Sequence, residues 1–197
     1  MKNWLEDLNK TLGLGLILAF IVFLIRGYYG ILGEISFWAF LFRWIHVVLG
    51  ILWIGLLYYF NFVQVAALKA AQADNSAAGI SRHVAPRALL FFRWAAVVTW
   101  LAGASILGGH FLDAFFFQQK VYVPIGIGAW LGTIMLFNVW VLIWPNQKKI
   151  LGIVAATDEQ KARARKTAGM ASRINFVLSI PMLLCMAGAS HGLPFMR

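Results

Sequence analysis

Residues 37–66 read FWAFLFRWIHVVLGILWIGLLYYFNFVQVA and include one formally charged side chain, Arg43. A helix needs about 20 predominantly apolar residues to cross the roughly 30 Å hydrocarbon core of a membrane. Similar apolar runs lie near 12–25, 88–109, 121–144 and 174–190. The sequence therefore predicts an all-α, polytopic membrane helical bundle of about five transmembrane helices, built as a single integral membrane domain over residues 1–197.

The composition supports this prediction. Hydrophobic residues make up 61% of the chain, charged residues only 12%, and the mean hydropathy is +0.78. A soluble domain has far more charged residues. The first apolar run follows Lys2, Glu6, Asp7 and Lys10 without a small-residue cleavage site, so we expect an uncleaved anchor. Pro145 is expected to end the fourth run.

The basic residues alternate between the connections. Thirteen of the seventeen fall on one predicted side of the membrane, and they are Lys2, Lys10, Lys69, Arg82, Arg87, Arg93, Lys148, Lys149, Lys161, Arg163, Arg165, Lys166 and Arg173. The positive-inside rule places this side in the cytoplasm, together with the N-terminus, and places the C-terminus outside. Topology and contact with the lipid bilayer explain the net charge of +10, so we expect no nucleic-acid binding.

Three of the four histidines are expected near the outer face, each on a different helix: His46, His110 and His191. Histidines on separate helices can ligate a haem or another metal such as copper. Gly50 and Gly103 would leave room for a porphyrin, although small residues also simply let membrane helices approach. The chain has one cysteine and no C-x-x-C-H motif, which excludes covalent attachment of c-type haem.

Other polar residues fall inside or beside the spans. Arg43 lies one turn before His46, where it would pair with Glu34, hold a haem propionate or reach the outer surface. Four amides are expected to form hydrogen bonds between helices, namely Asn61, Gln64, Asn138 and Asn175.

Four stretches of the chain are similar to a known family. They are RWIHVVLGILWIGLLYYFNFVQ (43–64), APRALLFFRWAA (85–96), GTIMLFNVWVLIWPNQKKI (132–150) and ASRINFVLSIPMLLCMAGASHG (171–192). In this order they resemble the N-terminal membrane domain of the bacterial membrane-bound urate oxidase family. Its long members carry a C-terminal cytochrome c domain and are implicated in oxidising urate to 5-hydroxyisourate, with electrons leaving through that cytochrome.

The resemblance implies particular ligands and a location. His46, in RWIH, and His191, in GASHG, would be shared ligands, whereas His110 lies in GGHFLDAFFFQQK without a clear match and depends on topology alone. The expected location is the bacterial cytoplasmic (inner) membrane, with a periplasmic C-terminus. The chain ends six residues after His191, so we expect the cytochrome c to be a separate protein.

Three functions are compatible with these features. The first is a membrane redox protein that binds haem b, or another metal such as copper, near the outer face. It would pass electrons from a small substrate such as urate to a cytochrome c and, if catalytic, would be an oxidoreductase. The second is a non-catalytic accessory subunit of a larger membrane respiratory or oxygenase complex. The third is a small-anion transporter, which the lack of an inverted repeat disfavours.

Overall fold

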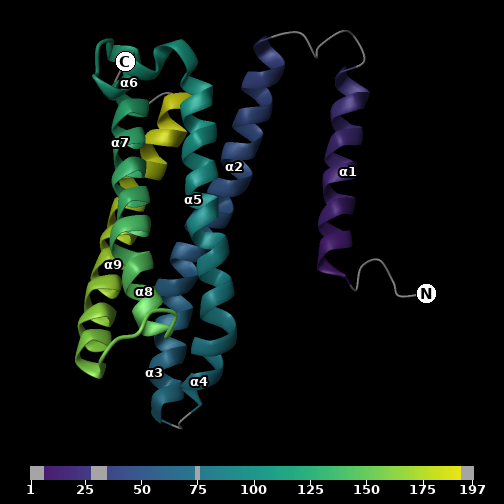
Figure 1. Cartoon of the computed structure of the whole chain (residues 1–197). Coiled ribbons are helices and arrows are strands. Elements are labelled where there is room, and N and C mark those ends of the chain that lie inside the picture. Colours follow the sequence, from purple (N-terminus) through teal and green to yellow (C-terminus); the bar gives the residue numbers. More distant parts are fainter. Residues whose placement is uncertain (1–6, 28–34, 74–75, 192–197) are drawn as a thin grey trace. The chain divides into compact units, whose positions relative to one another are not determined.

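The computed structural model describes residues 7–27, 35–73 and 76–191, with no strand among them, and the helices are shown in Figure 1. In chain order they are α1 (Leu8–Gly27), α2 (Ile35–Tyr59), η3 (Phe60–Gln64), α3 (Val65–Ala73), α4 (Ala77–Gly79), η4 (Ile80–Val84), α5 (Ala85–Leu107), η5 (Gly108–His110), α6 (Phe111–Phe115), η6 (Lys120–Tyr122), α7 (Val123–Phe137), η7 (Asn138–Ile143), α8 (Trp144–Ile150) and α9 (Asp158–His191). The predicted all-α class is confirmed.

Four helical segments are long and apolar enough to cross a membrane: 37–73, 77–115, 120–150 and 158–189. They contain the second to fifth predicted spans. The first predicted span, near 12–25, lies in α1, whose apolar segment is shorter. The chain is thus a multi-pass membrane protein.

Contacts divide the chain into two units, one up to Leu41 and one from Phe42 onward. In the first unit, the Asp7 carboxylate accepts hydrogen bonds from the backbone N–H groups of Asn9 and Lys10, at 2.9 and 3.3 Å, and so caps the start of α1. The ring of Phe23 packs edge-on against that of Phe37, 5.1 Å between centroids.

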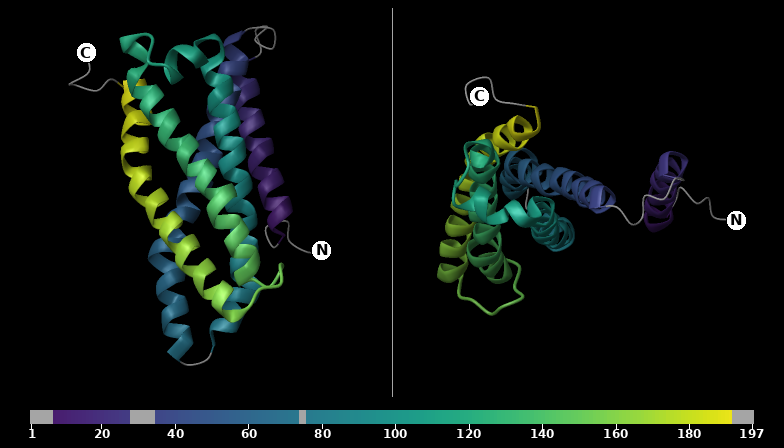
Figure 2. Two further views of the ribbon diagram at one scale, coloured as in Figure 1. Left: turned by 60° about the vertical axis from the view of Figure 1, so that its left-hand side comes forward. Right: turned by 90° about the horizontal axis from the view of Figure 1, so that it is seen from above.

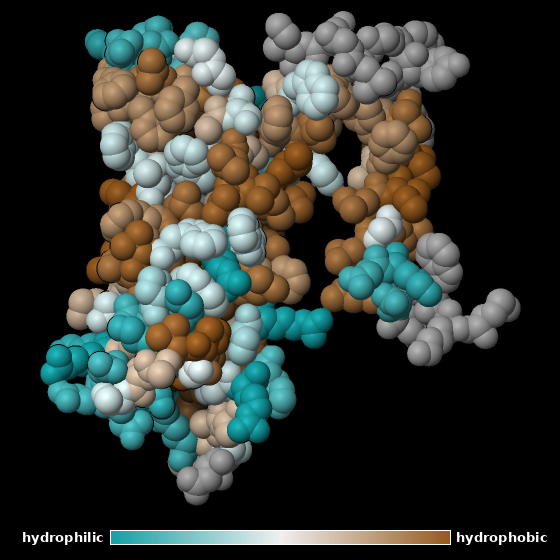
Figure 3. Space-filling model, in the orientation of Figure 1, coloured by the Kyte–Doolittle hydropathy of each residue, from teal (hydrophilic) through white to brown (hydrophobic). Residues whose placement is uncertain are grey.

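The second unit is a helix bundle in which α7 and α9 lie side by side (Figure 2). Its core is apolar and includes Leu57, Phe92, Met135 and Val139, each at most 1% exposed. Hydrophobic side chains also cover much of the outer surface, between more hydrophilic ends (Figure 3). This pattern suits a protein whose solvent is lipid at mid-height and water at the ends.

Proline does not end the fourth span. The prediction that the span stops at Pro145 is wrong, because the helix continues through α8 to Ile150. The π-helical segment η7 ends two residues before Pro145, and η4 ends two residues before Pro86. Local π-helical turns in membrane helices accommodate the hydrogen bond that proline cannot make.

The last helix begins well before its apolar part. The prediction near 174–190 covered only the membrane portion, whereas α9 begins at Asp158. Thr157 and Gln160 form a reciprocal capping box, since the N–H of each donates to the other's side-chain oxygen, at 3.0 and 3.2 Å.

The buried amides join helices as predicted. Asn138 donates to the side chain of Asn175 at 2.8 Å, and Asn175 donates to the carbonyl of Met135 at 3.0 Å. Asn61 donates to the hydroxyl of Ser172 at 3.1 Å. These bonds connect η7, α7 and η3 to α9, which confirms the prediction for three of the four amides. Gln64 Oε1 is buried and has no hydrogen-bond partner in the described part of the chain.

Candidate functional site

His46 lies on α2 and contacts α5. Its Nδ1 is 2.7 Å from the backbone carbonyl oxygen of Thr99. A carbonyl oxygen only accepts, so Nδ1 carries the proton and donates it. In the neutral ring, the lone pair is then on Nε2, the nitrogen that is available to a metal.

Gly103 makes this contact possible. It lies one turn beyond Thr99 on α5, and a Cβ atom built on it would be 2.9 Å from His46 Cε1 and 3.0 Å from Nδ1. The sequence-based interpretation gave this space to a porphyrin. In the structure, the imidazole of His46 fills it. Gly50 likewise faces a side chain of α5, with the Thr99 methyl 3.7 Å from a Cβ placed there.

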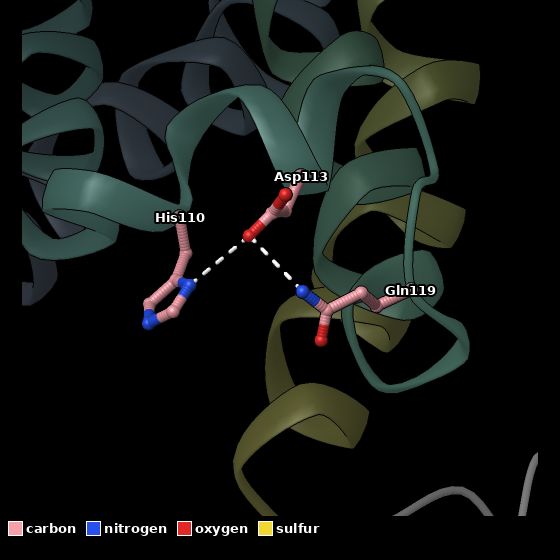
Figure 4. Close-up of polar contacts among 3 residues, drawn as sticks. All are labelled: His110, Asp113 and Gln119. Atoms are coloured by element: carbon pink, nitrogen blue, oxygen red, sulfur yellow. Dashed lines mark hydrogen bonds and ion pairs between the residues drawn. The ribbon is translucent and has the colours of Figure 1, made fainter.

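His110 ends the short helix η5, just beyond α5. Gly108 ends α5 with a positive φ of 49°, a conformation that side-chain-bearing residues rarely adopt, and thereby turns the chain. The Nδ1 of His110 is 3.1 Å from Oδ2 of Asp113, and Gln119 Nε2 donates to the same oxygen at 3.3 Å (Figure 4). The His110 ring also stacks on Tyr122, with centroids 4.9 Å apart and planes inclined by 26°.

As in His46, the Nδ1 of His110 faces an oxygen acceptor. The Asp113 carboxylate accepts from Nδ1, and Nε2 lies on the far side of the ring from Asp113 (Figure 4). The side chain of His110 is 60% exposed, while that of Asp113 is 22% exposed. A carboxylate that accepts from one ring nitrogen fixes the orientation of the ring.

The remaining predicted residues are only partly described. His191 is the last residue of α9, and its side chain lies outside the described residues. Arg43 is exposed on α2, and its predicted partner Glu34 also lies outside the described residues. The predicted Arg43–Glu34 pair therefore stays a prediction.

His46 and His110 have different neighbours along the chain. His46 contacts α5 at Thr99 and Gly103, whereas His110 follows the end of that helix at Leu107. Over the ranges that the structure describes, no three His, Cys, Asp or Glu residues group so that they could hold a metal ion. Within the described residues, His46 and His110 thus have different bonding partners.

Sequence reasoning missed the groups that orient these rings. Asp113 follows His110 by three residues, a helical spacing that could have indicated the pair. The partner of His46 is a backbone carbonyl, which carries no residue-specific signal. Tyr122 reaches His110 because the chain turns back after α6, and local periodicity does not reveal such a reversal.

Residues 109–197 match the family model described as urate oxidase N-terminal. The match contains two of the four stretches on which the resemblance was based, 132–150 and 171–192, while 43–64 and 85–96 lie before it. It also contains His110, for which the sequence alone gave no clear counterpart. No match was found among curated proteins or among solved structures. The resemblance is therefore confirmed over residues 109–197, which are similar to the urate oxidase N-terminal domain family.

Proposed function

We propose that this chain is a membrane redox protein that binds haem b near the outer ends of its helices and passes electrons to a separate cytochrome c. One observation carries the proposal. Both described outer-end histidines donate Nδ1–H to an oxygen acceptor, which leaves Nε2 as the atom for a metal. Metal-ligating histidines almost always donate their other ring N–H in this way. The family match of residues 109–197 supports a relation to urate oxidation, and a small reduced substrate such as urate belongs to the proposal.

The surroundings of His46 suit an axial ligand. Its ring is half-buried within a membrane-spanning helix and is held against α5 by the Thr99 carbonyl. We assign His46 as one ligand, with His191 as the second ligand implied by the family resemblance. Arg43, one turn before His46 on α2, would hold a haem propionate. When bound, the haem would supply one-electron transfer, with a potential set by its ligands and surroundings.

His110 suits a different task. Its ring is largely exposed and bonded to a carboxylate, so it can take up and release a proton close to water. We assign it to proton handling during substrate oxidation, or to a further ligand position. Copper is the alternative metal, since imidazole also suits copper.

The distribution of charge supports the orientation that we propose for the bundle. Basic residues lie on α3, η4, α8 and the first part of α9, at the end of the unit opposite α6 (Figure 1). His110 is beside α6. The positive-inside rule then places the basic end in the cytoplasm and His110 on the periplasmic side of a bacterial inner membrane.

The test is the visible spectrum of the full chain, purified from membranes in mild detergent. We expect a Soret band and a pyridine haemochrome of the b type. His46→Ala and His191→Ala should each abolish at least half of the haem content, whereas the matched control His83→Ala, on the opposite side, should retain it. His110→Ala should retain haem and slow substrate oxidation if its role is proton transfer.

Two results would contradict the assignment of haem. Haem-free protein after expression with added haem precursor would contradict it, and would favour the accessory subunit of a larger respiratory or oxygenase complex. Copper in metal analysis, without haem, would retain a redox role but change the cofactor. Circular dichroism of each variant separates loss of haem from loss of fold.

A further inference from the structure

The middle of α9 presents a shallow, open groove of about 550 Å³, and all of the residues that line it belong to α9 itself. Three cations line it, Arg165, Lys166 and Arg173, and all three side chains are exposed. Gly169 lies between them along the helix, and a Cβ atom placed on it would meet nothing within 4 Å. This shallow groove therefore has a positively charged part, with open space beside Gly169.

The lining changes from charged to apolar along the helix. Ile174 and Val177 line the groove beyond Arg173, and they are 45% and 65% exposed. At about 1.5 Å of rise per residue, Arg165 and Val177 lie roughly 18 Å apart along the axis. This length spans a phosphate-bearing headgroup and the upper part of an acyl chain, with the cations at the basic end of the bundle.

The acidic residues of α9 are engaged elsewhere. Asp158 lies 3.7 Å from the ammonium of Lys161, and Glu159 lies 2.6 Å from the guanidinium of Arg163. Their carboxylates thus pair with other cations of the same helix. The groove cations consequently present a net positive surface to whatever occupies the groove.

We propose that this groove binds an anionic phospholipid, with its phosphate on Arg165, Lys166 and Arg173 and an acyl chain along Ile174 and Val177. A soluble anion would contact only the charged part of the groove, and an apolar partner helix would provide no anionic group for the three cations. A phospholipid matches both parts. Basic surfaces at the cytoplasmic ends of membrane helices attract anionic headgroups. Each Lys or Arg raises the affinity about fivefold.

The experiment is native mass spectrometry of the full chain in detergent, titrated with phosphatidylglycerol or with phosphatidylcholine of the same acyl chains. We expect wild-type protein to bind phosphatidylglycerol at least tenfold more tightly. The variant R165Q/K166Q/R173Q should lose this preference. The matched control K69Q/R82Q/R87Q, which removes three exposed cations from other helices, should keep it.

A second variant tests the groove without changing charge. Gly169→Leu places a side chain in open space, so the fold should be retained while affinity for both lipids falls severalfold. Equal binding of the two lipids by wild type, or unchanged preference in the triple variant, would overturn the proposal. Displacement of phosphatidylglycerol by equimolar inorganic phosphate would show a soluble-anion site instead. A dimer that dissociates in Gly169→Leu would show that a second copy occupies the groove.

Discussion

His46 and His110 are the same residue type in two contrasting settings. His46 is half-buried and donates to a backbone carbonyl on another helix, with its ring beside Gly103. His110 is largely exposed and bonds to Asp113, three residues farther along the chain. The first geometry depends on how two helices pack, and the second on a local turn. Two histidines that the sequence groups together thus depend on different parts of the structure, His46 on helix packing and His110 on neighbouring residues of the chain.

The largest effect should come from Gly103→Ala. The added Cβ would lie within 3.0 Å of two atoms of the His46 ring, so the ring must leave the Thr99 carbonyl or the helices must separate. Overpacking of this kind costs about 1–3 kcal/mol. We expect that loss in the free energy of unfolding, measured by SDS titration of detergent-solubilised protein.

Gly55→Ala is the matched control for this change. A Cβ at Gly55, on the same helix as His46, meets nothing within 4 Å. We expect it to be neutral or slightly stabilising, since alanine favours helix by up to about 1 kcal/mol over glycine. Equal stability of the two variants would show that His46 is not held against α5 as described.

A smaller effect should follow from Tyr122→Ala, which removes the ring stacked on His110. Aromatic pairs contribute about 0.5–1.5 kcal/mol beyond their burial. We expect a loss in this range by the same titration, whereas Tyr122→Phe, which keeps the ring, should match wild type. If Tyr122→Phe destabilises as much as Tyr122→Ala, the hydroxyl and not the stacking supports this turn.

The smallest effect should come from Asp113→Ala. Asp113 pairs with a largely exposed imidazole, and exposed pairs contribute at most about 1 kcal/mol. We therefore expect a change below that value, and a still smaller one for Asp113→Asn, which retains an acceptor for His110. A loss as large as that of Gly103→Ala would remove the distinction between the firmly packed and the locally held histidine.

The helices could be predicted better than their ends. Apolar runs located the four long spans, because the hydrocarbon thickness imposes a minimum length. The same search missed the start of α9 at Asp158, since the first part of that helix is rich in charged helix formers and alanine and lies outside the apolar run. The pattern Thr157-x-x-Gln160 was readable as a capping box and would have located it.

The candidate site was predictable in its residue types but not in its contacts. Three histidines on separate helices indicated ligation, and the structure describes the side-chain contacts of two of them, His46 and His110. The role of Gly103 was misinterpreted. A glycine in the sequence indicates that there is space beside the helix, but it does not indicate which group fills that space. Only the packed helices show that the space belongs to His46.

The sequence alone identifies a multi-pass helical membrane protein, with basic residues concentrated in alternate connections and amides inside its spans. These properties follow from local composition and from the cost of polar groups in lipid. The tertiary structure decided that Asn138 pairs with Asn175, and that His46 bonds to Thr99. Such pairings depend on the rotation and axial register of one helix against another, and the 3.6-residue period of a single helix fixes neither.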